Sequence, residues 1–283
     1  MSETTHRLEH LPFGTSPLAA LLGRPKLVAA ACIVMLTVLG WLYLALLATA
    51  LETQNLLPRA IAVLCRETPQ PGAVAALVAL SMWVAMILAM MLPSAAPMIV
   101  TYAEIADTAA RKGERIVSPL MLAGGYVSVW IGFAVAVTFV QILLTNAAWL
   151  QAGRIVAGSP LAGVLFVVAG VYQFSALKHA CLTQCRQPFP FFFAHWQTTA
   201  RGVYRLGLRQ GLYCLGCCWA MMLLMFAAGV MNVLWMGTLG IIMATEKMLT
   251  GRRFAHALGV ILIAIGIAII GKTVVDYWPG RAA

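Results

Sequence analysis

Charged side chains are scarce in this 283-residue chain: they make up 10% of it, against 62% for hydrophobic residues. A soluble domain carries about 25% charged residues, so this composition argues against a soluble fold. Apolar runs long enough to cross a bilayer as a helix recur from end to end. The chain is therefore expected to be a polytopic membrane protein with one membrane domain and no separate soluble domain.

Motifs that mark common enzyme classes are missing. The chain has no glycine-rich phosphate loop, no H-E-x-x-H zinc motif and no G-x-S-x-G nucleophile elbow. His179, His195 and His256 are too dispersed to propose a haem pair. A binding or transport role is therefore expected ahead of an enzymatic one.

Acidic residues are few, which leaves a net charge of +10. The Lys and Arg residues lie in short segments between apolar runs, where they set membrane orientation rather than bind nucleic acid. The segment 178–211 is the most one-sided, because it holds five basic residues and no acid. We expect it to be a cytoplasmic segment outside the spans.

The apolar segments predict an all-α polytopic helix bundle of about seven transmembrane helices. The run from residue 212 to residue 248 is too long for one crossing, so we divide it between Gly229 and Asn232. A kink is expected where the second helix meets Pro93 and Pro97. The expected spans are residues 27–50, 73–92, 119–144, 160–177, 212–229, 232–249 and 255–277.

Orientation follows from the basic residues. A cytoplasmic N-terminus places the polar lead 1–26 and the loops 101–117, 178–211 and 250–254 inside, and these segments are rich in Lys and Arg. The outside loops, 51–72 and 145–159, hold only Arg59, Arg66 and Arg154. The C-terminal tail is residues 278–283.

Sulfur is concentrated in residues 211–225, which hold three cysteines and three methionines. At about 100° per residue, Cys214, Cys218, Met221 and Met225 share one side of a helix. Thiolates and thioethers are soft donors that select Cu(I), zinc or iron–sulfur centres over magnesium or calcium. Methionine in a membrane helix is more often packing, so the C-x-x-C-C pattern completed by Cys217 carries the prediction.

The expected topology brings further candidate ligands to the same cytoplasmic side. Cys181 and Cys185, with His179, follow the fourth span, although a lone histidine usually satisfies local hydrogen bonds. Glu246 and Lys247 end the sixth span, where a membrane-edge carboxylate is costly and therefore a functional candidate. We expect the five cysteines to form a metal site, with Glu246 and Lys247 as charged neighbours that gate or balance it.

A methionine stripe on the second helix extends this hypothesis. Met82, Met86 and Met90 recur every four residues and so share a face. Together with Met221 and Met225, Met86 and Met90 would form a thioether path along which Cu(I) is carried by ligand exchange.

Other interpretations stay open from the residues alone. C-x-x-x-C and C-x-x-C, separated by 28 residues, would also suit a Cys₄ zinc site, although the spacing of the first pair is loose and Cys218 is left over. Cys214 and Cys217 would suit a dithiol redox pair, although a cytoplasmic face disfavours a standing disulfide. The thiols would also be unliganded in a non-catalytic membrane assembly subunit.

Four blocks of sequence resemble a bacterial family of uncharacterised integral membrane proteins that are predicted to bind metal, some of them labelled copper chaperones. The blocks are residues 82–94, 178–188, 214–222 and 229–247, so the resemblance covers roughly residues 75–250. It implies a multi-pass protein of the bacterial inner membrane, surrounded by lipid, with copper as Cu(I) ahead of zinc. A soluble protein that donates or accepts the metal is then a candidate partner at the cytoplasmic face. No reaction is implied.

Overall fold

The computed structural model describes residues 25–52, 73–113, 116–151, 154–155, 160–229, 232–249 and 251–276. Within these ranges the protein is all-α, as predicted, apart from one antiparallel ladder in which Leu150–Gln151 (β1) pairs with Arg154–Ile155 (β2). The expected lead 1–26, the loop 51–72 and the tail 278–283 lie wholly or mostly outside the described residues.

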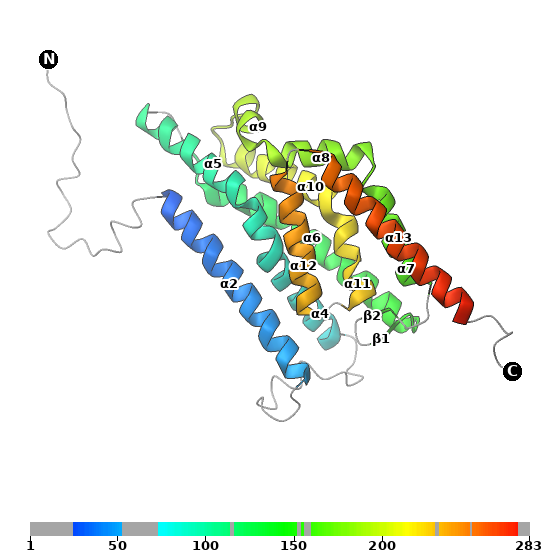
Figure 1. Ribbon diagram of the computed structural model, residues 1–283. Coiled ribbons are helices and arrows are strands. Elements are labelled where there is room, and N and C mark those ends of the chain that lie inside the picture. Colours follow the sequence, from blue (N-terminus) through cyan, green and yellow to red (C-terminus); the bar gives the residue numbers. More distant parts are fainter. Residues whose placement is uncertain are drawn as a thin grey trace, which may run out of the picture.

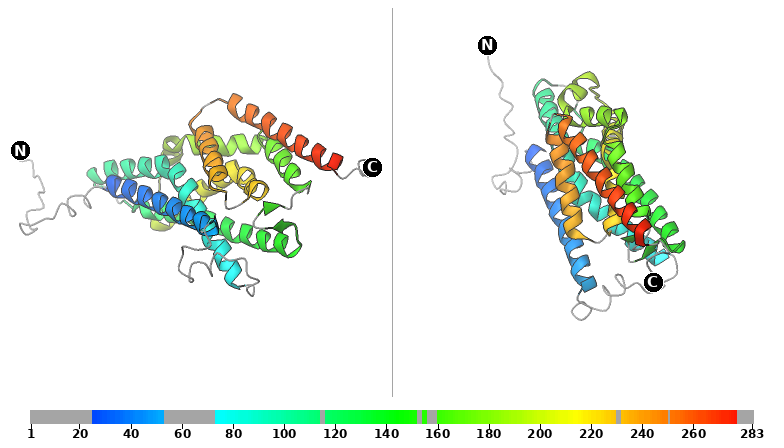
Figure 2. Two further views of the ribbon diagram at one scale, coloured as in Figure 1. Left: turned by 60° about the horizontal axis from the view of Figure 1, so that its bottom comes forward. Right: turned by 45° about the vertical axis from the view of Figure 1, so that its right-hand side comes forward.

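The helices form one bundle in which successive long segments run in opposite directions (Figure 1). The first half contains α2 (Pro25–Glu52), then α4 (Ala73–Met86), which continues through the π-helix η1 (Ile87–Met91) into α5 (Leu92–Arg111), and α6 (Pro119–Asn146). The second half contains α7 (Leu161–Tyr172), α8 (Ala176–Arg186), α9 (Pro188–Ala194), α10 (Ala200–Leu223), α11 (Met225–Ala228), α12 (Val233–Met248) and α13 (Arg253–Asp276). Two further views show the same bundle, with α8 lying across one end (Figure 2).

The second predicted helix differs from expectation around its prolines. The chain stays helical through Pro93 and Pro97, the prolines at which a kink was expected, and α5 ends only at Arg111. The irregularity lies one turn earlier, in η1, where the Leu92 N–H donates to the Ile87 carbonyl, five residues back. Residues 101–111, expected to begin a loop, are therefore helical, and an Arg111–Asp107 pair at 3.0 Å supports that last turn.

The fourth predicted helix is broken. It ends at Tyr172, and α8 starts after Ser175 at an angle of 66° to α7. The Ser175 hydroxyl accepts the Lys178 N–H at 3.1 Å, which satisfies a free donor at the start of the new helix. The segment 178–211, expected to lie outside the helices, is mostly helical, because α8, α9 and the first half of α10 occupy it.

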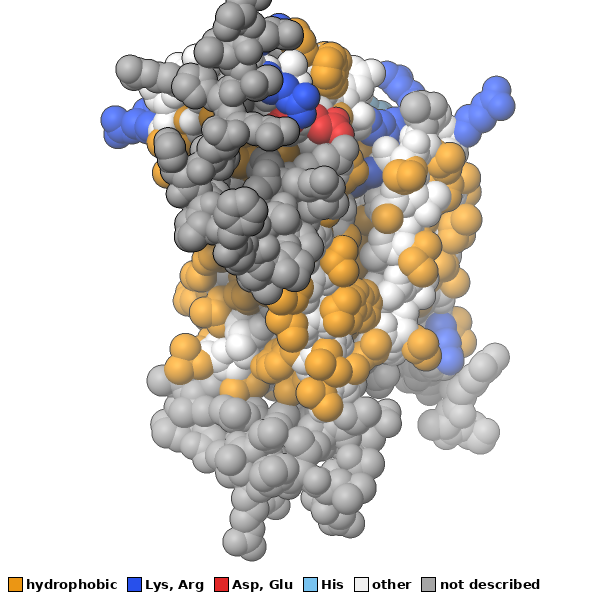
Figure 3. All heavy atoms as spheres, turned by 90° about the vertical axis from the view of Figure 1, so that its left-hand side faces the viewer, with side chains coloured by type: hydrophobic (Ala, Val, Ile, Leu, Met, Phe, Trp, Pro, Cys, Tyr) orange, Lys and Arg blue, Asp and Glu red, His pale blue; other side chains and the backbone are white. Residues whose placement is uncertain are grey.

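Five stretches of the described chain are long and apolar enough to cross a membrane, and the bent α7–α8 pair makes a sixth if it counts as one span. The helix α12 has 16 residues, which gives it a length of about 24 Å. The sides of the bundle carry hydrophobic side chains, whereas most of the visible Lys and Arg residues gather at the end drawn at the top (Figure 3). We call this the basic end. The start of α2, the end of α5, α8, α9 and the start of α10 lie at it (Figure 1).

Glycines bring α6 and α10 into backbone contact. A Cβ on Gly207 of α10 would overlap the Leu122 carbonyl, and one on Gly125 of α6 would overlap the Tyr204 carbonyl. Such close approach is available only to residues without a side chain. It holds Tyr126 of α6 directly against the sulfur-rich part of α10.

Candidate metal centre

Three cysteines from two helices come together inside the bundle. The Sγ atoms of Cys185 on α8 and of Cys214 and Cys217 on α10 all lie within 4.8 Å of one another. Cys214 and Cys217 are buried, at 3% and 2% exposure, and Cys185 is half-buried. A metal–thiolate bond of about 2.3 Å would separate two sulfur ligands by roughly 4.0 Å in a trigonal site and 4.6 Å in a linear one. The group therefore needs little contraction to hold one ion.

The bend before α8 and a glycine on α10 create this arrangement. Cys214 and Cys217 are one turn apart on α10, and Gly216 between them leaves room for α8 to lie close. A Cβ on Gly216 would come within 2.6 Å of the Cys181 Sγ. Cys181 thus packs against α10, and Cys185, one turn further along α8, reaches the other two thiols.

Cys214 is the most connected of the three cysteines. Its Sγ lies 3.1 Å from the hydroxyl of Tyr126, which also donates to the Met91 carbonyl at 3.1 Å. The Lys247 ammonium donates to the same sulfur at 3.2 Å and to the Ser94 hydroxyl at 2.8 Å. A cation in contact with a buried sulfur offsets the negative charge of a thiolate there.

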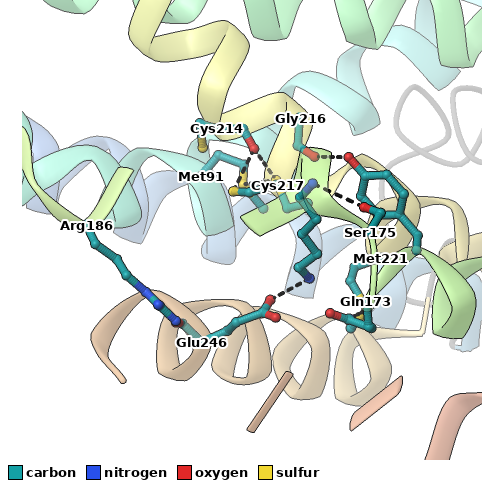
Figure 4. Close-up of polar contacts among 12 residues, drawn as sticks. Met91, Gln173, Ser175, Arg186, Cys214, Gly216, Cys217, Met221 and Glu246 are labelled. Carbon is teal, nitrogen blue, oxygen red and sulfur yellow. Dashed lines mark hydrogen bonds and ion pairs between the residues drawn. The ribbon is translucent and has the colours of Figure 1, made fainter. Parts of the chain in front are cut away.

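Glu246, the neighbour of Lys247 on α12, belongs to a different set of contacts. Its carboxylate accepts from the Lys178 ammonium at 2.8 Å, and both side chains are almost fully buried, at 4% and 0% exposure. Arg186 donates to the Glu246 backbone carbonyl at 2.6 Å. Figure 4 shows Arg186 of α8 extending toward Glu246 of α12. The pair ties α12 to α8 and so positions the helix that carries Cys185.

A cavity of about 630 Å³ reaches the cysteines from between α2, α5 and α12. Its wall includes Cys185 and Cys214 together with Lys247 and Arg186, and its other end is apolar, near Trp41 and Gly237. Cys217 is not part of the wall. An incoming ligand would therefore meet Cys185 and Cys214 before Cys217.

Residues 80–269 match the PpoB2 family, described as copper chaperone. The chain belongs to this copper chaperone family. The match covers two thirds of the chain and contains all the cysteines of the centre, which confirms the resemblance predicted from the sequence blocks. No curated protein and no solved structure matches the chain.

The remaining predicted ligands lie at different places around the three-cysteine group. Cys218 is buried beside it and donates to the Cys214 carbonyl at 2.9 Å. His179 of α8 faces away from the cysteines toward His256 of α13, with a ring separation of 5.6 Å. Glu246 contacts Lys178, whereas Lys247 makes the contact with sulfur that was expected of the charged pair.

The four predicted methionines are all buried, at 7% exposure or less. Met86 and Met225 are fully buried, and the Met221 sulfur accepts from the Gln173 amide at 3.3 Å. Met90 packs against Gly240 and lines the cavity. Met91, which was not among the predicted ligands, has its Sδ 3.9 Å from the Cys218 Sγ.

Sequence reasoning missed four residues of the site: Met91, Ser94, Tyr126 and Lys178. Met91 was overlooked because the stripe was counted at four residues per repeat, and the π turn inserts an extra residue before it. Lys178 was assigned to a basic loop, yet it is fully buried. The sequence did contain a signal for the burial of Lys178. Glu246 is an acid at the end of an apolar run, and such a carboxylate needs a basic partner.

Proposed function

We propose that this protein is a multi-pass protein of the bacterial inner membrane that binds Cu(I) through Cys185, Cys214 and Cys217 and passes it on by ligand exchange. The observation that carries the proposal is the convergence of three thiols from two helices within 4.8 Å. Soft thiolate donors select Cu(I) over the hard divalent cations. Membership of the copper chaperone family favours the same ion.

Seven crossings with the N-terminus in the cytoplasm agree best with the chain's charges. Successive long helices alternate in direction (Figure 1), and most of the Lys and Arg residues visible in Figure 3 gather at the basic end. The positive-inside rule assigns such an end to the cytoplasm. The copper site would then lie on the side where thiols are kept reduced.

Three features favour Cu(I) over zinc as the bound ion. Structural zinc sites are almost always four-coordinate. Among the described residues, the group instead consists of three cysteine sulfurs that lie within 4.8 Å of one another. The next polar group at Cys214 is the Lys247 ammonium, which has no lone pair to offer a metal. When Cys214 and Cys217 bind as thiolates and Cys185 as a neutral thiol, the two thiolates, one Cu(I) ion and this ammonium sum to zero charge, so the loaded site leaves no net charge buried.

The cavity supports transfer rather than storage. Its volume of about 630 Å³ is within the roughly 300–1,000 Å³ of small-ligand pockets. Cys185 and Cys214 are on its wall, so a donor's thiolate can replace or be replaced at the ion one bond at a time. We propose that the donor or acceptor is a soluble metal carrier on the cytoplasmic side, next to the basic residues of α8 and α10.

The test is copper retention by the purified, reduced full-length protein in detergent against a weak Cu(I) chelator. The wild type is expected to keep about one equivalent through the cysteine group, and a Cys185→Ser, Cys214→Ser, Cys217→Ser variant to keep none. Cys32→Ser is the matched control, because Cys32 lies on α2 outside the group.

Two results would contradict the proposal in different ways. Equal copper in the triple variant and the wild type would remove the cysteines from the site. A protein that holds no copper but cycles Cys214 and Cys217 with a dithiol reductant would be a thiol-redox protein instead. If all the cysteines tolerate serine without a change in cells, a role as a membrane assembly subunit would replace both.

A further inference from the structure

A second pair of sulfur atoms lies next to the three-cysteine group. The Sγ of Cys218 on α10 and the Sδ of Met91 in η1 are 3.9 Å apart. Both residues are buried, at 2% and 1% exposure. With metal–sulfur bonds of about 2.3 Å, a separation near 4.0 Å corresponds to two ligands at about 120° around one ion.

The Cys218–Met91 pair and the three-cysteine group share a hydrogen-bond acceptor, the backbone carbonyl of Cys214. The thiols of Cys217 and Cys218 both donate to the Cys214 carbonyl, at 3.0 and 2.9 Å. The two sulfurs therefore converge on one acceptor, although one belongs to the three-cysteine group and the other contacts Met91. Cys218 is also one turn, or about 6 Å, further along α10 from the basic end than Cys214.

The position of Met91 is fixed by the irregular turn that carries it. Met91 is the last residue of η1, and its carbonyl accepts from the hydroxyls of Ser94, at 2.7 Å, and Tyr126, at 3.1 Å. The same two side chains contact Lys247 and Cys214, so one network holds both sulfur groups. Single π turns inside α-helices occur frequently at functional sites.

Charge distinguishes the two groups. The Lys247 ammonium contacts the Cys214 sulfur, whereas the Cys218 sulfur contacts the neutral Met91 sulfur and the neutral Cys214 carbonyl. A Cu(I) ion bound by one thiolate and one thioether has no net charge, so it needs no countercharge in an apolar interior. The Cys218–Met91 pair therefore suits a monovalent soft ion better than a divalent one.

We propose that Cys218 and Met91 form a second Cu(I) site, which receives the ion from the three-cysteine group; this inference rests on the proposed function. In the transfer, a bond from copper to the Cys218 sulfur forms as the bond to the Cys217 sulfur breaks. The bonds from copper to Cys185 and Cys214 then break as the Met91 sulfur binds, which leaves Cys214 as a thiolate beside Lys247 and Cys185 as a neutral thiol. The thiol proton of Cys218 moves to the Cys217 thiolate, and the neutral Met91 thioether completes the new site. Copper stays Cu(I), and the total charge is unchanged.

Copper X-ray absorption on full-length protein labelled with selenomethionine tests this site directly, because selenium bound to copper gives its own scattering shell. The wild type loaded with two equivalents of Cu(I) is expected to have a copper–selenium shell, and Met91→Leu to lose it. Leucine conserves the volume of methionine, so the fold is expected to persist. Met222→Leu is the matched control, since Met222 is also fully buried on α10, and it is expected to keep the shell. Cys218→Ala is expected to lose the second equivalent and keep the first.

The outcomes separate this site from the proposed function. If the first equivalent binds through the cysteines and the copper–selenium shell is absent from the wild type, or survives in Met91→Leu, the second site is wrong and the first stands. If the wild type binds no Cu(I), both are overturned. Loss of the shell in Met222→Leu as well would also overturn the assignment to Met91.

Discussion

Two lysines of the site have different kinds of partner: the buried Lys178 of α8 and the half-buried Lys247 of α12. Lys178 faces the Glu246 carboxylate, which balances its charge within the fold. Lys247 reaches a hydroxyl and a cysteine sulfur, and a thiol balances a cation only when it loses its proton or holds a metal. The first pair is complete in itself and ties helices together. The second leaves a charge that a copper–thiolate group can balance.

The largest effect is expected from breaking the ion pair between Lys178 and Glu246. Glu246→Gln leaves the Lys178 charge buried without an anion, which should destabilise the fold by about 3–5 kcal/mol. Thermal unfolding of the purified protein in detergent measures this. The double variant Lys178→Met, Glu246→Gln should recover much of the loss, and a double variant as unstable as the single one would contradict an ion-pair role.

Lys247→Met is expected to spare the fold and weaken copper binding by about tenfold or more, because a hydrogen bond to a charged group contributes about 1.5–3 kcal/mol. Competition with a Cu(I) chelator measures the change. Lys247→Arg keeps the charge and should retain most of the affinity, and Lys112→Met, at an exposed lysine, should have no effect. Equal affinity in Lys247→Met and the wild type would remove Lys247 from the site.

Gly216→Ala sharpens the comparison because it displaces α8 while both lysines are kept. The new Cβ would lie 2.6 Å from the Cys181 Sγ, and overpacking of this kind costs about 1–3 kcal/mol. Copper retention should fall with stability, because Cys185 is displaced from Cys214 and Cys217. Adding Cys181→Ala makes room and should restore both, unless Cys181 is itself a ligand, in which case stability alone returns.

Tyr126→Phe should have the smallest effect. It removes the hydroxyl between the Cys214 sulfur and the Met91 carbonyl, a loss of about 0.5–1.5 kcal/mol for a neutral hydrogen bond. A several-fold lower Cu(I) affinity with normal thermal unfolding is expected. Tyr204→Phe, which removes a hydroxyl bonded to Ser128 at 2.8 Å, is the control and should leave copper affinity unchanged.

Much of this arrangement follows from sequence patterns that depend on local chemistry. Apolar runs indicated the all-α fold, and soft donors with C-x-x-C-C spacing placed Cys214, Cys217 and Cys218 on one helix. Bringing Cys185 to them required only that α8 return to the same end of the bundle. These predictions use residue type and regular helical repeat, which a single sequence contains.

The parts that were missed depend on departures from that regular repeat. The 66° bend before α8 and the π turn before Pro93 change which side chains face the core. Neither leaves a clear mark in the sequence, because Ser175 is an ordinary capping residue and Ile87–Met91 is an ordinary apolar stretch. Two of the four missed residues lie at these irregular turns: Met91 ends the π turn, and Lys178 is in the first turn after the bend.

The carbonyl of Cys214 has a consequence for the metal-free protein. Because it accepts both the Cys217 and the Cys218 thiol, the backbone of α10 alone shelters two reactive groups in their protonated, uncharged form. In the metal-free protein, neither of these two thiols therefore needs a charged neighbour to be stable in an apolar interior. On the proposed function, binding of Cu(I) to either sulfur would replace that hydrogen bond, so a single carbonyl keeps both ligands in place until the ion arrives.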